Sequence, residues 1–172
     1  LADVSPELVR RLLQDKLEGQ MDEDIGSVVS VTKVHDIGDG AVLPNRPGVY
    51  YEADFDVVTF DPQMQEVVDG EVVEVVNFGA FVGIGPVDGL LHVSQISDEY
   101  LAYDGENQQL ASRDSNRVLS VGDSVRARIV TKSVDERNPR DSKIGLTAKQ
   151  PGLGKLGWLK EERERREAQA GD

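Results

Sequence analysis

The sequence contains no cysteine and only two histidines, His35 and His92. The missing cysteines exclude a disulfide framework, a thiolate zinc site and a cysteine nucleophile, and two histidines alone cannot form a histidine-rich metal site. No apolar run approaches the roughly 18 residues that a membrane-spanning helix needs. No basic segment followed by an apolar one opens the chain, so we find no signal peptide and expect a cytoplasmic protein without a membrane partner.

Catalytic motifs are also missing from the sequence. Neither histidine lies in a recognisable nucleophile motif, and Ser94 lacks the G-x-S-x-G surroundings of a hydrolase nucleophile. Gly83-Ile84-Gly85 is followed by Pro86 and not by a helix, which argues against a dinucleotide-binding loop. We therefore expect no catalytic residues, no metal and no cofactor on this chain.

Basic side chains are scarce. The 172 residues carry 32 acidic and 19 basic groups, a formal net charge of −13. Such acidity is typical of proteins adapted to molar salt, where charges are screened within roughly 3 Å; an ordinary acidic protein is the alternative. Residues 120–149 are the exception, because seven basic groups stand there against four acidic ones, so a local basic stripe is expected.

The opening of the chain predicts a helix. Ser5 can cap it, Pro6 suits its first position and Gly19 suits its end. Apolar residues at helical spacing follow the cap: Leu8, Val9, Leu12, Leu13 and Leu17. A single short amphipathic helix of this kind needs a surface to cover.

The period changes after this helix. Residues 25–35 are valine-rich and alternate, which predicts a strand, and residues 48–60 supply further strand pieces. Asp61-Pro62 predicts a turn, and we place a domain boundary near 61–66. The first domain then spans 1–65, where burial is marginal. Its core is expected to need a partner chain, the second domain or residues upstream of Leu1.

Residues 66–150 predict a second, β-rich domain. Residues 66–84 carry the strongest strand signal. Shorter strands are expected at 90–93, 124–134 and 143–146. Short strands with glycine turns and little helix indicate a small antiparallel barrel, and we expect the polar residues 99–118 to form a loop or insertion.

Residues 151–172 form a third segment. Residues 151–159 are apolar but contain three glycines, so we expect them to be extended and docked. Residues 160–169 are nearly all charged, and i,i+4 pairs such as Glu161–Arg165 predict a solvated helix.

Two phenylalanines in the first barrel strands allow two interpretations. Strict alternation would put Phe78 and Phe81 on opposite faces of the sheet, whereas a bulge at Gly79-Ala80 would put both on one face. Two exposed rings side by side can stack successive bases, at roughly 1–3 kcal/mol per base. The alternative is that one or both rings belong to the core.

Three segments in order resemble the S1 RNA-binding domain, a five-stranded member of the OB-fold class. They are GEVVEVVNFGAFVGIGPVDGLLHVSQIS at 70–97, VGDSVRARIV at 121–130 and SKIGLTAKQ at 142–150. The resemblance implies a nucleic-acid face at Phe78, Phe81, His92, Asp135 and Lys143. Many S1 domains carry arginine at the last position, and Lys143 keeps the charge without the planar fork. A structural role for His92 and a turn role for Asp135 are the alternatives.

Salt adaptation would change how such a face binds RNA. Counterion release weakens as salt rises, so RNA capture is expected to depend on Phe78 and Phe81. The basic side chains Arg126, Arg128 and Lys143 are then secondary. The alternative is an acidic barrel that binds RNA negligibly and acts as a spacer.

The order of segments along the whole chain resembles a larger family. A capped helix, KLEGQMDEDIGSVVSVTKVHDIGDG, YYEADFDVVTFDPQMQEVVDGEVVEVVNFGAFV, a long insertion after HVSQIS, and AKQPGLGKLGWLKEE follow one another. This order is similar to that of the E-prime stalk protein of archaeal RNA polymerase, the larger of the two stalk subunits and counterpart of the eukaryotic seventh subunit. The resemblance implies an α+β fold, with an N-terminal ribonucleoprotein-like domain that lacks its first strand and a C-terminal S1-type OB-fold barrel.

The same resemblance implies a function. It predicts a non-catalytic stalk subunit that assists promoter opening, elongation and termination, while the nucleotidyltransferase chemistry belongs to the large subunits. The implied partners are the smaller stalk protein of RNA polymerase (the F subunit), with which it forms a heterodimer, the polymerase core and nascent single-stranded RNA. A free-standing S1-domain RNA-binding factor in translation or RNA decay is the alternative. A purely structural interaction protein is a third possibility.

Four apolar residues near the C-terminus are candidates for docking on the smaller stalk protein or across the domain junction. They are Leu153, Leu156, Trp158 and Leu159. Packing within the chain, which would close the barrel, is the alternative.

Overall fold

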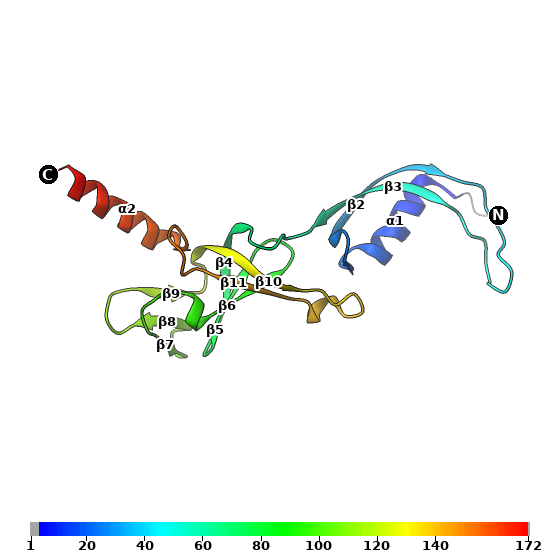
Figure 1. Ribbon diagram of the computed structural model, residues 1–172. Coiled ribbons are helices and arrows are strands. Elements are labelled where there is room, and N and C mark those ends of the chain that lie inside the picture. The colour runs from blue at the N-terminus through cyan, green and yellow to red at the C-terminus, as the bar shows by residue number, and fades with distance from the viewer. Residues whose placement is uncertain (1–3, 172) are drawn as a thin grey trace. The chain divides into compact units, whose positions relative to one another are not determined.

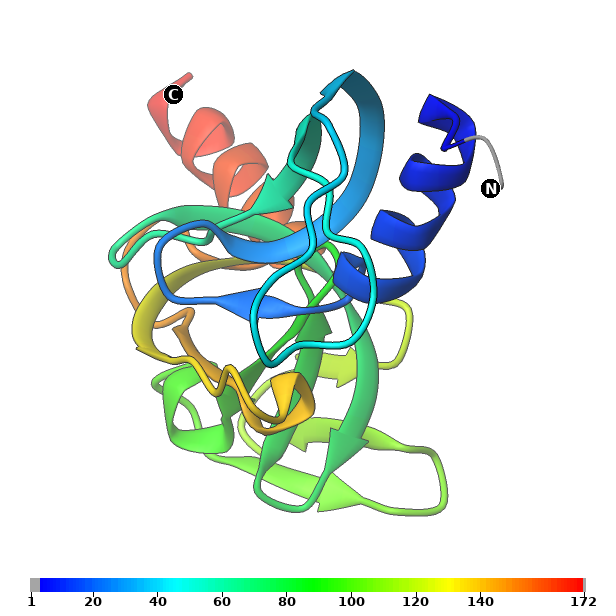
Figure 2. The ribbon, with the colours of Figure 1, turned by 90° about the vertical axis from the view of Figure 1, so that its right-hand side faces the viewer.

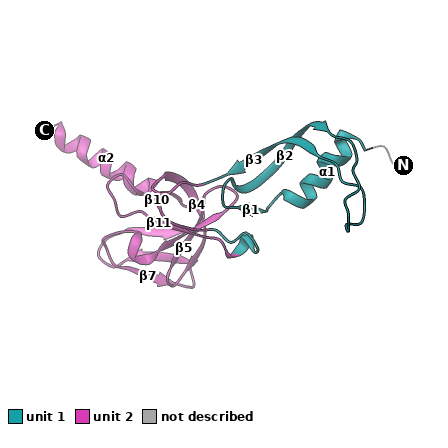
Figure 3. Cartoon of the chain, turned by 45° about the vertical axis from the view of Figure 1, so that its right-hand side comes forward, with its two compact units in different colours: residues 1–61, 134–140 teal, residues 62–133, 141–172 magenta. Residues whose placement is uncertain are grey.

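The computed structural model describes residues 4–171 (Figure 1). The chain forms two units, residues 1–61 with 134–140 and residues 62–133 with 141–172 (Figure 3). The first unit combines a helix with a three-stranded sheet, and the second is built of strands and ends in a helix. This mixture confirms the expected α+β class. The place of the family's expected first strand, ahead of the helix, lies outside the described residues.

Helix α1 (Pro6–Leu17) begins where the sequence predicts. The Ser5 hydroxyl accepts a hydrogen bond from the Leu8 amide at 3.2 Å, and Pro6 occupies the first turn. The helix lies against the sheet of its own unit, where the Gln14 side-chain amide donates to the Val31 carbonyl at 3.1 Å. The capped helix therefore covers one strand and is bound to it by this hydrogen bond.

The sheet of the first unit is antiparallel in the order β1 (Met21–Asp22), β2 (Gly26–Ile37) and β3 (Ala53–Phe60). Its strands twist strongly, because the β2–β3 register shifts three times along the pair. Gly26 opens β2 with a φ of +79°, and a Cβ there would lie 2.3 Å from the Phe60 carbonyl oxygen. This tight start of β2 therefore requires glycine.

The first unit has a thin core. Its buried apolar side chains among the described residues are Met21, Val28 and Val31. Within α1 no described residue is fully buried, and Leu12 remains 58% exposed. The sequence predicts marginal burial in the first domain, and the sheet and helix of the first unit do bury few side chains.

The second unit contains a closed five-stranded barrel. Its strands are β4 (Val67–Val76), β5 (Gly79–Gly83), β6 (Asp88–His92), β10 (Ser124–Ser133) and β11 (Lys143–Thr147). They pair in the order β11-β6-β5-β4-β10, and β10 pairs with β11 to close the ring. All neighbours are antiparallel except β11 and β6, which run parallel. This closure confirms the predicted OB-like barrel.

Alternation fills the barrel with aliphatic side chains. Buried and outward positions alternate along β5, β6, β10 and β11. The fully buried side chains of the barrel include Val72, Val82, Leu91, Val125, Ile129 and Leu146. The residues between them face outward, on the surface of the barrel.

Residues 99–118 differ from the expected loop. They contribute to a small antiparallel sheet of β7 (Leu101–Asp104), β8 (Gln109–Ser112) and β9 (Val118–Ser120). Leu101, Leu110 and Leu119, one from each strand, are buried. The strands are short and their leucines are nine residues apart, so no periodicity marks them in the sequence. We call this sheet the insertion sheet.

The C-terminal segment is less extended than expected. Strand β12 (Gly154–Lys155) pairs with β10, and helix α2 (Leu156–Ala170) follows at once. The charged helix is confirmed, although its ion pairs differ from the expected ones. Lys160–Glu164 and Arg163–Glu167 pair along the helix at 3.9 and 3.6 Å. Glu162 instead binds Arg117, beside the insertion sheet.

Candidate nucleic-acid interface

Phe78 and Phe81 lie together at one end of the barrel. Val76 pairs with Gly79, so Asn77 and Phe78 form the turn of the β4–β5 hairpin. The two rings meet edge to face, with centroids 6.3 Å apart and planes at 85°. Phe78 is 45% exposed and Phe81 is half-buried. Neither ring belongs to the described barrel core, so both can contact a ligand.

The bulge proposed from the sequence lies elsewhere. The β4–β5 register is continuous through Gly79 and Ala80, and it shifts at Val73 in β4. Phe78 meets Phe81 because it occupies the turn, where strand alternation no longer dictates the direction of a side chain. The interpretation that relied on a bulge at Gly79-Ala80 is therefore wrong about the bulge, although the two rings do lie side by side.

His92 lies beside this hairpin. It ends β6 and pairs with Gly79, and the next amide, that of Val93, donates to the Phe78 carbonyl at 2.8 Å. The exposed imidazole is held by Ser94, whose hydroxyl lies 2.8 Å from Nδ1 and whose amide donates to Nδ1 at 3.2 Å. Ser94 was not predicted from the sequence as a partner of His92; its position two residues later, at a tight bend, was the available signal.

Lys143 lies at the far end of the same outer face. The next residue, Ile144, pairs with Gly89, so Lys143 is level with Asp88 at the start of β6. His92 ends that strand, about 13 Å away at roughly 3.3 Å per residue. Phe81 lies between these two levels, because it pairs with Leu90. The three predicted side chains therefore form a band along the barrel. Lys143 is exposed and makes no ion pair within residues 4–171.

Arg126 and Arg128 lie away from the aromatic pair. Arg126 is opposite Asp69 on β4, whereas Phe81 is opposite Glu74, five residues or about 16 Å further along that strand. The Arg126 guanidinium binds both oxygens of Asp69, at 2.7 and 2.9 Å. These hydrogen bonds hold the pKa of Asp69 below its usual value.

Arg128 is also engaged within the barrel. It donates to Gln150 Oε1 at 2.8 Å and to the Gln65 carbonyl at 2.7 Å. Each of these two arginines would have to break a hydrogen bond within the protein before its whole guanidinium could bind RNA. Lys143 has no such ion pair to break.

Asp135 belongs to a different part of the structure. It lies in the 134–140 segment, which forms part of the first unit (Figure 3). Its carboxylate accepts from the amides of Arg137 and Asn138 at 3.0 and 2.9 Å. These bonds are typical of a turn-forming aspartate. They explain why an aspartate stands at this position without invoking a bound ligand.

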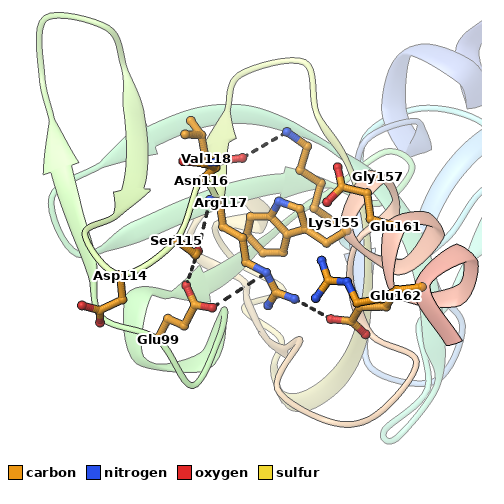
Figure 4. Close-up of a pocket in the computed structure, with 12 residues that line it drawn as sticks. Glu99, Asp114, Ser115, Asn116, Arg117, Val118, Lys155, Gly157, Glu161 and Glu162 are labelled. Carbon is orange, nitrogen blue, oxygen red and sulfur yellow. Dashed lines mark hydrogen bonds and ion pairs between the residues drawn. The ribbon is translucent and has the colours of Figure 1, made fainter. Parts of the chain in front are cut away.

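Trp158 lies within the second unit. It is 7% exposed, and the Arg117 guanidinium lies 5.2 Å from its ring centroid. Arg117 also pairs with Glu162 and approaches Glu99 at 4.0 Å (Figure 4). Leu153, Leu156 and Leu159 remain half-buried. Burial inside this chain accounts for Trp158, and docking of the four residues on another protein stays a prediction.

The cluster around Arg117 lines a pocket of about 690 Å³ between the insertion sheet and α2 (Figure 4). Hydrogen bonds from Ser115, then Ser112, and the charge of Arg117 hold the pKa of Glu99 below its usual value. Lys155 binds the Val118 carbonyl at 3.0 Å and Asp123 at 2.9 Å. The charged side chains that line the pocket therefore form hydrogen bonds and ion pairs mainly with other groups of this chain.

Residues 4–171 offer neither a metal centre nor a membrane span. No group of three or more metal-ligating side chains comes together there. No helix in that range is both long and apolar enough to span a bilayer.

Comparisons with known proteins agree with this architecture. Residues 61–143 match the S1 RNA binding domain, and residues 1–47 match the SHS2 domain found in the N terminus of Rpb7p/Rpc25p/MJ0397. DNA-directed RNA polymerase subunit Rpo7 of Saccharolobus shibatae is 39% identical over 155 residues, which cover 89% of this chain and 84% of the relative.

Other similar proteins share only part of the chain. Small ribosomal subunit protein bS1 of Staphylococcus epidermidis is 40% identical over 77 residues, 45% of this chain and 16% of its own. The solved apo form of Mycoplasma genitalium RNase R is 24% identical with a TM-score of 0.40, over 48% of this chain and 13% of that one. The two matched domains and the identity to Rpo7 over most of both lengths confirm the resemblance: this chain belongs to the family of archaeal RNA polymerase subunit Rpo7.

Proposed function

We propose that this chain is a non-catalytic stalk subunit of a DNA-directed RNA polymerase. Its first unit pairs with the smaller stalk protein and anchors the stalk on the polymerase core. Its S1 barrel binds the emerging transcript and thereby assists promoter opening, elongation and termination. Nucleotidyl transfer belongs to the large subunits of the same enzyme. The Rpo7 relatives and the S1 match support this assignment.

The Phe78–Phe81 pair is the observation that carries the RNA-binding part of the proposal. Two rings at 85° on an exposed hairpin offer one face and one edge to unpaired bases. His92 adds an imidazole held by Ser94, and Lys143 adds a charge that forms no ion pair within residues 4–171. These four residues are the proposed RNA face. Arg126, Arg128 and Asp135 are secondary, because each is held by a protein partner.

The first unit carries the proposed protein interface. Apolar side chains remain exposed on its helix and on its sheet, among them Leu8 and Leu12 on α1 and Val29 and Val58 on the strands. Such exposure in a unit with so thin a core supports a partner that covers it. The smaller stalk protein and the polymerase core are the proposed partners, and we place them in the cytoplasm of a salt-adapted cell.

The two parts of the proposal are tested separately. The chain, expressed with an affinity tag in its native cell, is expected to co-purify with polymerase subunits; recovery as a lone monomer contradicts the stalk role and favours a free-standing RNA-binding factor. RNA binding is measured by fluorescence anisotropy on the full chain. Phe78→Ala with Phe81→Ala is expected to weaken RNA binding at least about tenfold. Val121→Ala, at a side chain as exposed as Phe78, is the control.

A further inference from the structure

Tyr100 and Arg113 form an exposed pair on the insertion sheet. Leu101 pairs with Ser112, so the residues just outside this pair, Tyr100 and Arg113, come together at the same end of β7 and β8. The Arg113 guanidinium carbon lies 5.9 Å from the centroid of the Tyr100 ring. Tyr100 is 67% exposed. One face of the ring is therefore covered by a cation while much of the ring stays open to a ligand.

Arg113 keeps its charge available in an acidic neighbourhood. It forms no ion pair within the described part of the chain. The nearest acidic residues before Tyr100 are already satisfied: Asp98 pairs with Lys149 at 3.3 Å, and Glu99 binds Ser115 and Arg117. A stacked arginine of this kind combines a planar surface with charge, which are the two properties that bind a base and its phosphate.

The neighbouring tyrosine is arranged differently. A Cβ on Gly105 would lie 3.3 Å from the Tyr103 ring, so Tyr103 folds over the backbone of its own hairpin. Tyr103 is 43% exposed, against 67% for Tyr100. Tyr100 is therefore the more exposed of the two rings.

The pair adjoins the proposed RNA face. The insertion sheet follows His92 after a short 3₁₀ turn, η1 (Val93–Gln95), and the loop 96–100, and β8 contacts β4. In both Figure 1 and Figure 2 the β4–β5 hairpin and the insertion sheet lie in the lower part of the second unit. The proposed path of the RNA therefore runs from the β4–β5 hairpin to the insertion sheet of the same unit.

We propose that Tyr100 and Arg113 form a second contact for single-stranded RNA, beyond the barrel. A base stacks on the open face of Tyr100, and the Arg113 guanidinium binds a neighbouring phosphate. The contact engages only transcripts long enough to cross from the barrel to the insertion sheet. This inference rests on the proposed RNA-binding function of the barrel.

RNA length separates the two contacts. The full chain is titrated with oligonucleotides of about 4 and about 16 nucleotides, the limits for one OB fold. Tyr100→Ala with Arg113→Ala is expected to weaken binding of the longer RNA about 5- to 10-fold and to leave the shorter RNA unaffected. The slope of log K against log salt should fall by about 0.7, the value for one lost phosphate contact on a single strand.

Two controls separate this inference from the proposed function. Val121→Ala with Arg166→Ala removes an exposed apolar side chain and an exposed arginine outside the insertion sheet, and it should change neither affinity. Phe78→Ala with Phe81→Ala should weaken both RNAs. If the Tyr100 and Arg113 changes leave the longer RNA unaffected, or weaken both lengths equally, the second contact is overturned while barrel binding stands. If the wild type binds neither RNA, the proposed function falls as well.

Discussion

Ser94 holds His92 in one orientation and one tautomer. Its hydroxyl lies 2.8 Å from His92 Nδ1, and its backbone amide donates to the same nitrogen at 3.2 Å. A nitrogen that accepts an N–H bond carries no proton, so the neutral imidazole is protonated at Nε2. The outer face of the barrel therefore presents an N–H donor beside Phe78.

Ser94→Ala tests this relationship. Loss of the hydroxyl should free the ring and weaken RNA binding about threefold, the equivalent of one neutral hydrogen bond. Imidazole ¹⁵N shifts should still report the Nε2–H tautomer, because the backbone amide of residue 94 still donates to Nδ1. Ser124→Ala, at an exposed serine on β10, should leave RNA binding unchanged. In a double-mutant cycle the effect should vanish when His92 is alanine. A loss that persists in that background would mean that Ser94 acts on RNA without His92.

The barrel could be predicted from the sequence because its strands obey simple rules. Val-rich alternation over 66–84 and the turn at Gly85-Pro86 leave few other folds for that segment. The insertion sheet could not be predicted in the same way. Its strands span three or four residues, and Leu101, Leu110 and Leu119 belong to a common core only after the hairpins form.

The candidate site shows a similar limit. The sequence placed Phe78 and Phe81 near each other, but only the turn geometry decides that the rings meet outside the core. The basic stripe at 120–149 was visible as a count of charges. The ion pairs of its basic side chains could not be predicted, because Asp69 and Arg126 are 57 residues apart in the chain and meet only when their strands pair.

RNA binding in concentrated salt should depend more on rings than on charges. Phe78→Ala with Phe81→Ala is expected to weaken binding at molar KCl more than Arg126→Ala with Arg128→Ala, because counterion release fades with salt while stacking persists. The hydrogen bonds that Arg126 and Arg128 form within the protein also favour a small contribution of these two side chains to RNA binding. Anisotropy titrations at about 0.1 M and about 1 M KCl measure the ranking, and the opposite order in the higher salt would refute it.

The Asp69–Arg126 pair should make a small, pH-dependent contribution to stability. Hydrogen bonds from Arg126 lower the pKa of Asp69 in the folded chain relative to its ordinary value of 3.8. The stabilisation is therefore complete above about pH 4, where the unfolded carboxyl ionises, and it declines as pH falls through the folded-state pKa. Both side chains are largely solvated, so Asp69→Asn should lower Tm by at most about 4 °C at about pH 7. The difference from wild type should shrink below about pH 4; a constant difference would contradict this origin.

Arg117 should hold helix α2 on the insertion sheet. Arg117→Ala removes the pair with Glu162 and the cation over Trp158, and it should lower the free energy of unfolding by about 2 kcal/mol. Because Trp158 is the only tryptophan, its emission reports the docking directly. The variant should shift that emission to the red and raise quenching by iodide, as the ring becomes exposed. Arg163→Ala removes an exposed pair within α2 and should leave the emission unchanged. Unchanged emission in Arg117→Ala would mean that apolar packing alone holds the helix, and that the charges of the pocket contribute nothing to its position.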